Sequence, residues 1–231
     1  MISVVITVHP PLLKHLERCI DSVLWQLSPA DECIVIGDGC SALGARGFFR
    51  DARIKNFNTG EAKGECAARN VGLREARHDW IKFLDADDLL APFALNAFRS
   101  VVGKLPDAIS VLAGATIKVH NGLVVGYSDP PPIEQLITRV NPILPSMVFV
   151  RRSAAQAVAG FDERIDFEGD WDFWLRLRKA GYRFAIHRRP FCCYWIDDAE
   201  RAEKEASRTH QVEGVDVREY LARTYGITPE R

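Results

Sequence analysis

Long apolar runs are missing from this 231-residue sequence. No stretch reaches the roughly 18 apolar residues that a membrane-spanning helix needs. The first apolar run, residues 2–8, is interrupted by Ser3 and Thr7 and has neither a basic segment before it nor a small-residue cleavage site after it, so it does not resemble a signal peptide. We therefore expect a buried strand there. We also expect a cytoplasmic protein that makes at most a peripheral membrane contact, at the inner face.

Cysteine pairs with metal-binding or redox spacing are also missing. The six cysteines, at positions 19, 33, 40, 66, 192 and 193, contain no C-x-x-C pair, which favours reduced thiols. Charge of one sign is not in excess, since 30 Lys and Arg face 31 Asp and Glu, for a net charge of -1. A dedicated nucleic-acid-binding protein is usually basic, so we expect no nucleic-acid partner.

Several common catalytic and nucleotide-binding motifs are absent as well. The first strand is not followed by G-x-G-x-x-G or G-x-x-x-x-G-K-[ST], which argues against a dinucleotide site or a P-loop. Neither H-E-x-x-H nor G-x-S-x-G occurs, which argues against a zinc protease and a serine hydrolase of the common types.

The elements that are present alternate between strand and helix in the first hundred residues. Apolar, β-branched runs predict strands, and apolar residues at helical spacing predict the intervening helices. Single helices between strands indicate a parallel sheet with right-handed crossovers. The predicted strands are 3–8, 33–36, 53–57 and 80–84, and the predicted helices are 12–27, 64–76 and 93–102.

The second half has a mixed pattern. Asn121-Gly122 is a favoured two-residue turn and predicts a hairpin of strands 109–119 and 123–127. The tail from residue 198 is charged and predicts a helical appendage. The sequence therefore favours one continuous α/β unit with a mixed second half. The other predicted elements are strands 147–150 and 184–186 and helices 153–159 and 171–180.

Carboxylates follow two of the predicted strands. Asp38 comes after strand 33–36, and Asp85, Asp87 and Asp88 come after strand 80–84. Ligands of open α/β sheets sit at the carboxyl ends of the strands, and clustered carboxylates are natural ligands of Mg²⁺ or Mn²⁺. A divalent metal that holds a phosphorylated ligand would explain the cluster. A turn in which Asp87 or Asp88 caps the following helix would explain it equally well.

A third group, residues 168–174, places carboxylates beside aromatic rings at a helix start. An aromatic face can cover the C–H groups of a sugar while an acid binds a hydroxyl, so sugar recognition is one interpretation. A capped helix with Trp174 in the core is the other.

Five segments of the chain together resemble family 2 glycosyltransferases with the GT-A fold, and they occur in the family's order. The resemblance covers about residues 2–195, and it rests on the five segments together, not on any one of them. The segments are VVITVH with SVLWQ (4–9, 22–26), IVIGDGCS (34–41), GECAARNVGL (64–73), FLDADD (83–88), and GFDE with DWDFWLRL (160–163, 170–177).

The resemblance implies a single GT-A domain over residues 1–196, with a Rossmann-like, mostly parallel central sheet. Its nucleotide-binding half would be 1–105 and its acceptor-binding half 106–196, with 197–231 as the helical appendage. The implied reaction is metal-dependent and inverting, with Mn²⁺ or Mg²⁺ as cofactor. A nucleoside-diphosphate sugar, foremost a UDP-sugar, would donate to a hydroxyl of a glycan or a lipid-linked acceptor in polysaccharide or other glycan assembly. A homodimer is left open.

The resemblance also assigns residue roles. Asp170 would be the general base, Asp87 a metal ligand and Asp85 a ligand of the ribose or the metal. Trp171 would border the acceptor, and Asp197 stands where a third metal ligand could lie. The remaining donor-site residues would be Thr7, His9 and Asp38 at the nucleoside, and Lys63 and Arg69 near the base or diphosphate.

Three departures from the family pattern leave a second hypothesis open. Gly37 replaces an Asp, Gly169 replaces the Glu before the catalytic Asp, and Asp197 replaces a His. A non-catalytic sugar-nucleotide-binding or scaffold module of the same fold would tolerate such changes.

A third hypothesis is a nucleotidyltransferase, which would be expected to carry a glycine-rich loop after the first strand. This chain has Thr7-Val8-His9-Pro10-Pro11 there, which argues against that hypothesis.

Overall fold

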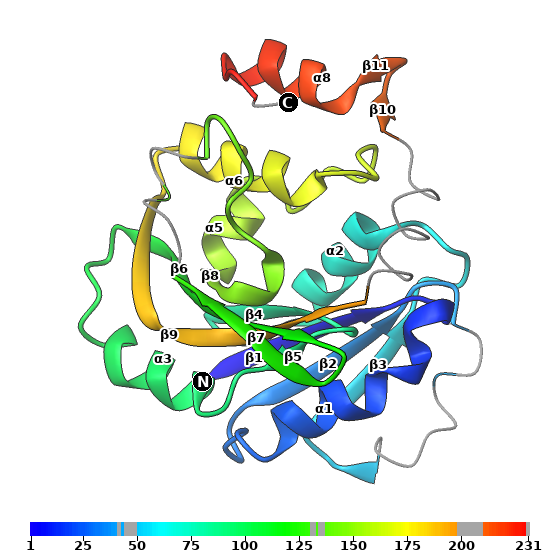
Figure 1. The fold of residues 1–231 in the computed structure, drawn as a ribbon, viewed down its shortest axis with the longest axis vertical. Helices are drawn as coiled ribbons and strands as arrows, with labels where there is room; N and C mark the ends of the chain where they lie inside the picture. The colour runs from blue at the N-terminus through cyan, green and yellow to red at the C-terminus, as the bar shows by residue number, and fades with distance from the viewer. Residues whose placement is uncertain (41–42, 44–49, 130–132, 134–136, 198–209, 230–231) are drawn as a thin grey trace.

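The structure, a computed structural model, describes residues 1–40, 43, 50–129, 133, 137–197 and 210–229. Ser41, the triple proline 130–132 and the tail segment 198–209 lie outside the described residues. The centre of the molecule is a nine-stranded sheet in the order β3-β2-β1-β4-β8-β6-β9-β5, with β7 paired to β6 (Figure 1). Helices cover both faces of this sheet, which is the α/β architecture that the sequence predicts.

The first four strands are parallel, as predicted from the single helices between them. β1 is buried along its whole length because neighbouring strands flank it and helices lie on both faces. The helix predicted over 12–27 is divided: a 3-10 helix starts at Pro10, and the α-helix begins only after His15. The elements are β1 (Ile2–Val8), η1 (Pro10–Lys14), α1 (Leu16–Leu24), β2 (Glu32–Gly37), β3 (Ile54–Asn58), α2 (Glu65–Glu75), β4 (Trp80–Asp85) and α3 (Ala94–Val102).

The second half adds antiparallel strands, as the mixed pattern suggests. β8 is antiparallel to both β4 and β6, and the predicted hairpin is present as β6 and β7. β9 has 14 residues and is parallel to β6, although the sequence predicts only the short strand 184–186 there. The elements are β5 (Leu89–Leu90), β6 (Ile109–His120), β7 (Leu123–Ser128), η4 (Pro145–Met147), β8 (Val148–Arg151), α5 (Arg152–Ala157), α6 (Gly169–Lys179) and β9 (Arg183–Ile196).

The sheet separates two apolar cores. α1 and α3 lie on one side of it, and α2, α5 and α6 lie on the other (Figure 1). Trp174 is fully buried in the second core, as the capped-helix interpretation expects, and its indole N–H donates to the Ile143 carbonyl at 3.1 Å. The core therefore fixes α6, the helix that begins with the acidic-aromatic segment.

The described part of the C-terminal tail is a short hairpin followed by one helix. β10 (Gln211–Val212) pairs with β11 (Val215–Asp216), and α8 (Val217–Tyr225) lies over α6 (Figure 1). Val217 and Leu221 belong to the same core cluster as Trp174. The proposed division at residue 197 stays a prediction, but the described end of the tail packs onto the rest of the chain.

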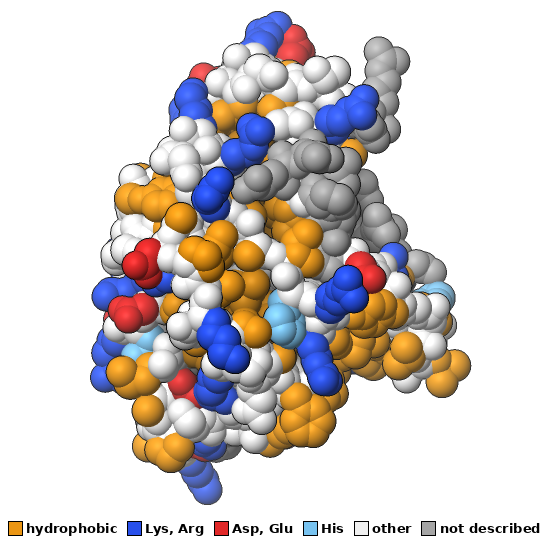
Figure 2. Space-filling model, turned by 90° about the vertical axis from the view of Figure 1, so that its left-hand side faces the viewer, with side chains coloured by type: hydrophobic (Ala, Val, Ile, Leu, Met, Phe, Trp, Pro, Cys, Tyr) orange, Lys and Arg blue, Asp and Glu red, His pale blue; other side chains and the backbone are white. Residues whose placement is uncertain are grey.

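Figure 2 shows the side of the molecule where α3 and the bend of β9 lie. Lys and Arg side chains are spread over this face between apolar ones. The basic pair Arg188-Arg189 lies within β9. That any membrane contact is peripheral stays a prediction. Within the described residues, no helix is both long enough and apolar enough to cross a bilayer.

Candidate active site

The ends of three parallel strands bring the first candidate residues together. Thr7 of β1 pairs with Asp85 of β4, and the next residue, Val8, pairs with Gly37 of β2. The Asp38 N–H donates to the Val8 carbonyl at 2.7 Å, so the loop after β2 continues along β1. Parallel pairing thus places Thr7, Asp38 and Asp85 at one edge of the sheet.

Two adjoining cavities open at this edge. The smaller, about 230 Å³, is lined by Thr7, His9, Asp38 and Asp85 among others. The larger, about 550 Å³, has the volume of an ordinary small-ligand site. They share His9 and Asp85 on their walls. The sequence-predicted residues that line the larger cavity are His9, Arg69, Asp85, Asp87, Asp170 and Asp197.

Asp38 is 7% exposed, and its carboxylate already has several partners. Oδ1 accepts hydrogen bonds from the Lys63 N–H at 2.7 Å and the Thr59 hydroxyl at 2.9 Å, and Oδ2 accepts one from the Gly64 N–H at 2.9 Å. These bonds hold the segment before α2 against the end of β2. Asp38 therefore shapes the wall of the smaller cavity.

Gly37, which departs from the family pattern, has a packing reason. A Cβ atom at this position would lie 2.9 Å from Cβ of Cys40 and 2.9 Å from Cδ2 of Leu43. The loop after β2 folds back over the strand end, and a side chain at 37 would displace it.

The acidic cluster consists of Asp85, Asp87 and Asp88, whose nearest carboxylate oxygens all lie within 4.8 Å of one another. Asp88 is 2% exposed and accepts a hydrogen bond from the Trp195 N–H at 3.0 Å, which ties the cluster to the end of β9. Burial raises the pKa of the Asp88 carboxyl, and Asp87 and Asp85 raise it further.

The alternative role of these aspartates as helix caps does not apply. The next helix, α3, starts at Ala94, and Phe93 precedes it without a capping hydrogen bond from its side chain. The sequence analysis places Asp88 in the acidic cluster but assigns it no role. The consecutive carboxylates Asp87 and Asp88 were the pattern that could have indicated one. The neighbourhood of Asp88 depends on β9, which arrives from more than a hundred residues away.

Arg69 forms an ion pair with Asp85 of the cluster. It is 4% exposed, and its Nη2 donates to Asp85 Oδ1 at 2.8 Å and to Glu65 Oε2 at 3.3 Å. Burial alone would lower the pKa of Arg69, but Asp85 and Glu65 raise it above its ordinary value. Lys63 lies differently: its side chain is exposed and lines neither cavity, and its contribution is the backbone N–H on Asp38.

Asp170 lies in the first turn of α6 and faces the larger cavity. Burial raises the pKa of its carboxyl, and the charges of Glu65 and Asp85 add to the rise. The Arg69 guanidinium and a hydrogen bond from Asn141 oppose it. The fold thus brings Asp170 to the same cavity as Asp87, from which it is separated by 83 positions in the sequence.

Two other predicted residues lie at different depths. Trp171 is 1% exposed and lines neither cavity, and its indole N–H donates to the Ile137 carbonyl at 2.6 Å. It supports the cavity wall from beneath. Asp197, after β9, lines the larger cavity but does not belong to the cluster of Asp85, Asp87 and Asp88.

The larger cavity is strongly acidic. In the part of the chain that the structure describes, eight lining carboxylates face three Lys or Arg side chains, and one of these cations, Arg218, comes from α8. Sequence reasoning did not select Arg218, because nothing in a charged tail indicates which of its residues returns to the site. It included Glu168 only within the acidic-aromatic segment 168–174, and it did not select Asp166. The acidic residues are Glu65, Asp85, Asp87, Asp88, Asp166, Glu168, Asp170 and Asp197, and the cations are Lys14, Arg69 and Arg218.

Two solved structures share this fold. S. aureus TarS (residues 1-349, in complex with UDP-GlcNAc) matches 85% of this chain and 59% of its own with a TM-score of 0.69 and 18% identity. The mannosyltransferase PcManGT from Pyrobaculum calidifontis, in complex with GDP-Man and Mn²⁺, matches 85% of this chain and 57% of its own with a TM-score of 0.63 and 17% identity. This chain thus spans less than two thirds of either structure.

Sequence relatives agree with the fold. The uncharacterized glycosyltransferase YwdF of Bacillus subtilis (strain 168) is 27% identical over 190 residues, which cover 77% of this chain and 68% of that protein. The O-antigen biosynthesis protein RfbC of Myxococcus xanthus is 27% identical over 188 residues, which cover 78% of this chain and 14% of that protein. The family described as "Glycosyl transferase family 2" matches residues 3–158, well over half of the chain. With these residues and this sheet, the chain belongs to glycosyl transferase family 2 and is a glycosyltransferase of the GT-A fold.

Proposed function

We propose that this protein transfers a sugar from a nucleoside-diphosphate sugar to a hydroxyl acceptor, with a divalent metal and with inversion at the anomeric carbon. One observation supports this proposal above the others. The acidic cluster of Asp85, Asp87 and Asp88 and the single carboxylate of Asp170 line one cavity, although they come from opposite halves of the chain.

The charge of the cavity supports the need for a metal. Among the described residues, eight carboxylates and three Lys or Arg side chains line it, so a diphosphate would meet net repulsion from these groups. A divalent cation held by the aspartates would offset part of that repulsion. Three carboxylates with oxygens within 4.8 Å of one another suit Mn²⁺ or Mg²⁺, which prefer oxygen ligands.

Asp87 and Asp85 would hold this metal, with Asp88 beside them. Asp197 lies on the wall of the same cavity and is a candidate for a further ligand. When bound, such a metal would stabilise the negative charge that develops on the leaving diphosphate. Asp85 is already fixed by Arg69 at 2.8 Å, so its orientation is set before any ligand arrives.

The smaller cavity is the proposed nucleoside site. Thr7 and His9 line it at the end of β1, and Asp38 lines it at the end of β2. Arg69 would lie near the diphosphate because it is next to Asp85. The proposed contact of Lys63 with the donor would be made by its exposed side chain.

Asp170 would accept the proton of the attacking hydroxyl. The acceptor oxygen forms its bond to the anomeric carbon from one side, while the bond to the phosphate oxygen breaks on the other and leaves its electron pair there. General base catalysis becomes more efficient as the pKa of the base rises toward the working pH. The raised pKa of Asp170 therefore suits this role.

The acceptor would enter beside α6. Phe167, just before α6, lines the larger cavity, as does Tyr194 of β9, and Trp171 is buried behind its wall. The complexes of TarS with UDP-GlcNAc and of PcManGT with GDP-Man support a nucleotide sugar as donor, and we propose a UDP-sugar first. The relation to RfbC, together with the resemblance above, supports a glycan or lipid-linked acceptor in polysaccharide assembly.

A thermal-shift screen tests the donor. UDP, GDP, UDP-GlcNAc and GDP-mannose would each be added with Mn²⁺ and, separately, with EDTA. A ligand that binds the native state raises the melting temperature by mass action. We expect at least one nucleotide to raise it only when Mn²⁺ is present. Equal shifts with EDTA would contradict the metal requirement, and no shift with any of the four would contradict the donor class.

The alternative of a non-catalytic module is not favoured by the site. The substitutions that motivated it include Gly37, which packing against Cys40 and Leu43 explains. Donor binding without any slow hydrolysis to free sugar and nucleotide would be the result in its favour.

A further inference from the structure

The C-terminal helix α8 contacts both acidic neighbours of Asp170. Arg218 of α8 donates to Glu168, two residues before Asp170, from Nη2 at 2.8 Å and from Nε at 3.1 Å. Tyr225, at the other end of α8, donates from its hydroxyl to Oδ1 of Asp172, two residues after Asp170, at 2.6 Å. One helix thus holds the first turn of α6 on both sides of the proposed base.

The Glu168 contact fixes an unusual backbone. Glu168 immediately precedes α6 with φ 58° and ψ 25°, the left-handed region that residues other than glycine rarely adopt. Its side chain is 11% exposed, so the carboxylate is held at the edge of the cavity rather than in open solvent. A two-pronged guanidinium contact restrains both the position and the orientation of that carboxylate.

The Asp172 contact lies inside the protein. Asp172 is 1% exposed, and its second oxygen, Oδ2, accepts a hydrogen bond from Nε of Arg176 at 2.8 Å. The Tyr225 hydroxyl therefore completes the hydrogen bonding of a buried carboxylate, which is costly to leave unpaired. Removing Tyr225 would remove one of the two hydrogen-bonded contacts between α8 and this turn of the helix.

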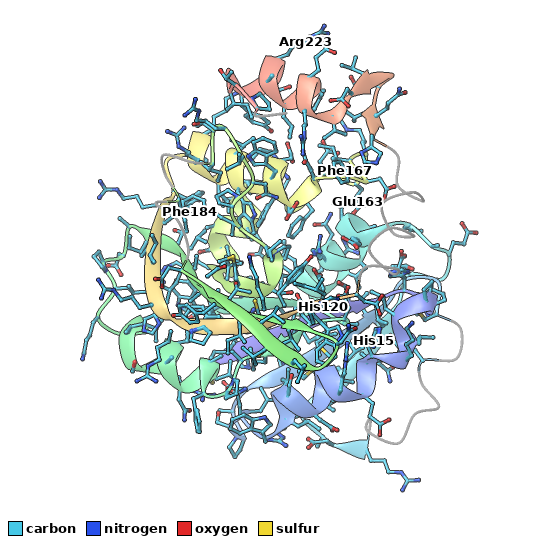
Figure 3. The ribbon with its side chains drawn as sticks, in the orientation of Figure 1. His15, His120, Glu163, Phe167, Phe184 and Arg223 are labelled. Carbon is cyan, nitrogen blue, oxygen red and sulfur yellow. The ribbon has the colours of Figure 1, made fainter. Side chains whose placement is uncertain are left out.

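Packing strengthens the connection between the tail and the site. The Phe167 ring lies 4.2 Å, centroid to centroid, from the ring of His210, just before β10. Val217 and Leu221 of α8 are buried in the same core cluster as Trp171. Figure 3 shows Phe167 between the start of α6 and the C-terminal segment.

We infer that the C-terminal segment 210–229 is a positioning element of the active site. Arg218 and Tyr225 act through Glu168 and Asp172 and set the position of Asp170. This inference rests on the proposed function, in which Asp170 is the general base. It gives a role in the reaction to a segment outside residues 3–158, the part of the chain that the family match covers.

Five single variants, one of them Glu168→Gln, and one double variant test the inference. Arg218→Ala removes the contact with Glu168, and Arg218→Lys keeps the charge but not the two-pronged geometry. Tyr225→Phe removes only the hydroxyl. Arg223→Ala is the matched control, because Arg223 is also on α8 but is 68% exposed and points away from the rest of the molecule (Figure 3).

The first measurement is amide hydrogen exchange of the ligand-free protein. We expect exchange at residues 169–173 to become at least tenfold faster in Arg218→Ala and in Tyr225→Phe. Arg218→Lys should fall between these and the unaltered protein, and Arg223→Ala should match the unaltered protein. Unchanged exchange at 169–173 in both Arg218→Ala and Tyr225→Phe would overturn the inference, whatever the substrate proves to be.

The second measurement separates positioning from contact with substrate. The reaction is hydrolysis of UDP-GlcNAc or GDP-mannose with Mn²⁺, whichever gives the larger thermal shift. If Arg218 acts through Glu168, Arg218→Ala should lower kcat at least tenfold with little change in KM for the donor. The double variant Arg218→Ala, Glu168→Gln should then lose no more than the larger single loss. Additive losses, or a loss confined to KM, would instead place Arg218 on the substrate and overturn a positioning role.

The two proposals fail in different ways. If Asp170→Asn keeps the turnover of the unaltered protein, the base assignment fails. If Asp170→Asn is inactive while Arg218→Ala and Tyr225→Phe keep full kcat and unchanged exchange, only the positioning role fails. If the unaltered protein hydrolyses neither donor, that result counts against the proposed function, and the exchange measurement still decides whether α8 holds α6.

Discussion

Gly169 and Cys66 touch so closely that no side chain fits between them. A Cβ atom at position 169 would lie 2.3 Å from Sγ of Cys66. Cys66 is 5% exposed, and its thiol donates a hydrogen bond to the Ile165 carbonyl at 3.3 Å. This contact joins α2 to the start of α6. It explains why this chain has glycine directly before Asp170, where the family pattern has Glu, and Glu168 supplies a carboxylate one position earlier.

Replacing Gly169 with Ala should therefore destabilise the protein, by about 1–3 kcal/mol for an overpacked core position. The change would also displace Asp170, so turnover should fall. Chemical denaturation would give the change in the free energy of unfolding. The double variant Gly169→Ala, Cys66→Ala removes the clashing sulfur and should recover part of the loss. If the two losses simply add, the steric explanation is wrong.

Replacing Asp87 with Ala should abolish the Mn²⁺-dependent binding of a nucleoside diphosphate. The reason is that the remaining carboxylates would hold the metal too weakly to offset the acidic cavity. Isothermal titration of UDP with Mn²⁺ present measures the affinity. The control is Asp107→Ala, because Asp107 is a fully exposed carboxylate that lines neither cavity. An unchanged affinity in Asp87→Ala would remove Asp87 from the metal site.

Replacing Asp170 with Asn should lower kcat by about 10²–10⁴-fold, the usual contribution of a general base. Donor binding should persist, because the amide keeps the size of the carboxyl and the proposed metal ligands are untouched. In the unaltered protein, kcat should also fall as the pH drops through the pKa of Asp170, since only the ionised carboxylate accepts a proton. That pKa is raised by burial, so the fall should occur above the pH expected of an exposed Asp. A profile that stays flat down to pH 4 would contradict this assignment.

Glu32 should contribute stability that depends on pH. Burial alone would raise the pKa of Glu32, but hydrogen bonds from Ser3, Arg77 and Lys55 lower it to about 2. A lowered folded-state pKa stabilises the fold above the ordinary value, and this stability is lost as the pH falls through about 2. Glu32→Gln should therefore cost about 3 kcal/mol at pH 7. The difference from the unaltered protein should shrink below pH 4.5, as denaturation at several pH values would show. Glu61→Gln, at an exposed position, should show no such dependence.

The sequence indicated the first half of the fold well, for a physical reason. β1, β2, β3 and β4 are short apolar runs bounded by polar turns, and their parallel order follows from the single helices between them. β9 was underestimated because Arg188, Arg189 and Pro190 interrupt its apolar pattern. In the structure β9 pairs with β6, and register shifts near Gly114 and Ala115 accommodate these residues. Such pairing depends on β6, so the local sequence of β9 does not reveal it.

In the candidate site too, local sequence predicts some residue positions, and long-range contacts decide the others. Local sequence places Asp38 and Asp85 at strand ends, because a carboxylate after a buried run must lie at the sheet edge. It does not show that Asp88 is buried against the end of β9, that Trp171 is covered by the core, or that Arg218 returns to the cavity. These facts depend on contacts between residues that are distant in the chain.

The sequence by itself determined the chemistry that is available: carboxylates after two buried strands, a further acidic turn before α6, and the motifs that indicate the family. Only the tertiary structure decided which carboxylates share a cavity, which are already occupied by hydrogen bonds, and which part of the tail holds the helix that carries Asp170. The physical reason is that residue type and local pattern act over a few residues. Burial and the meeting of charges depend on how the whole chain packs around the sheet.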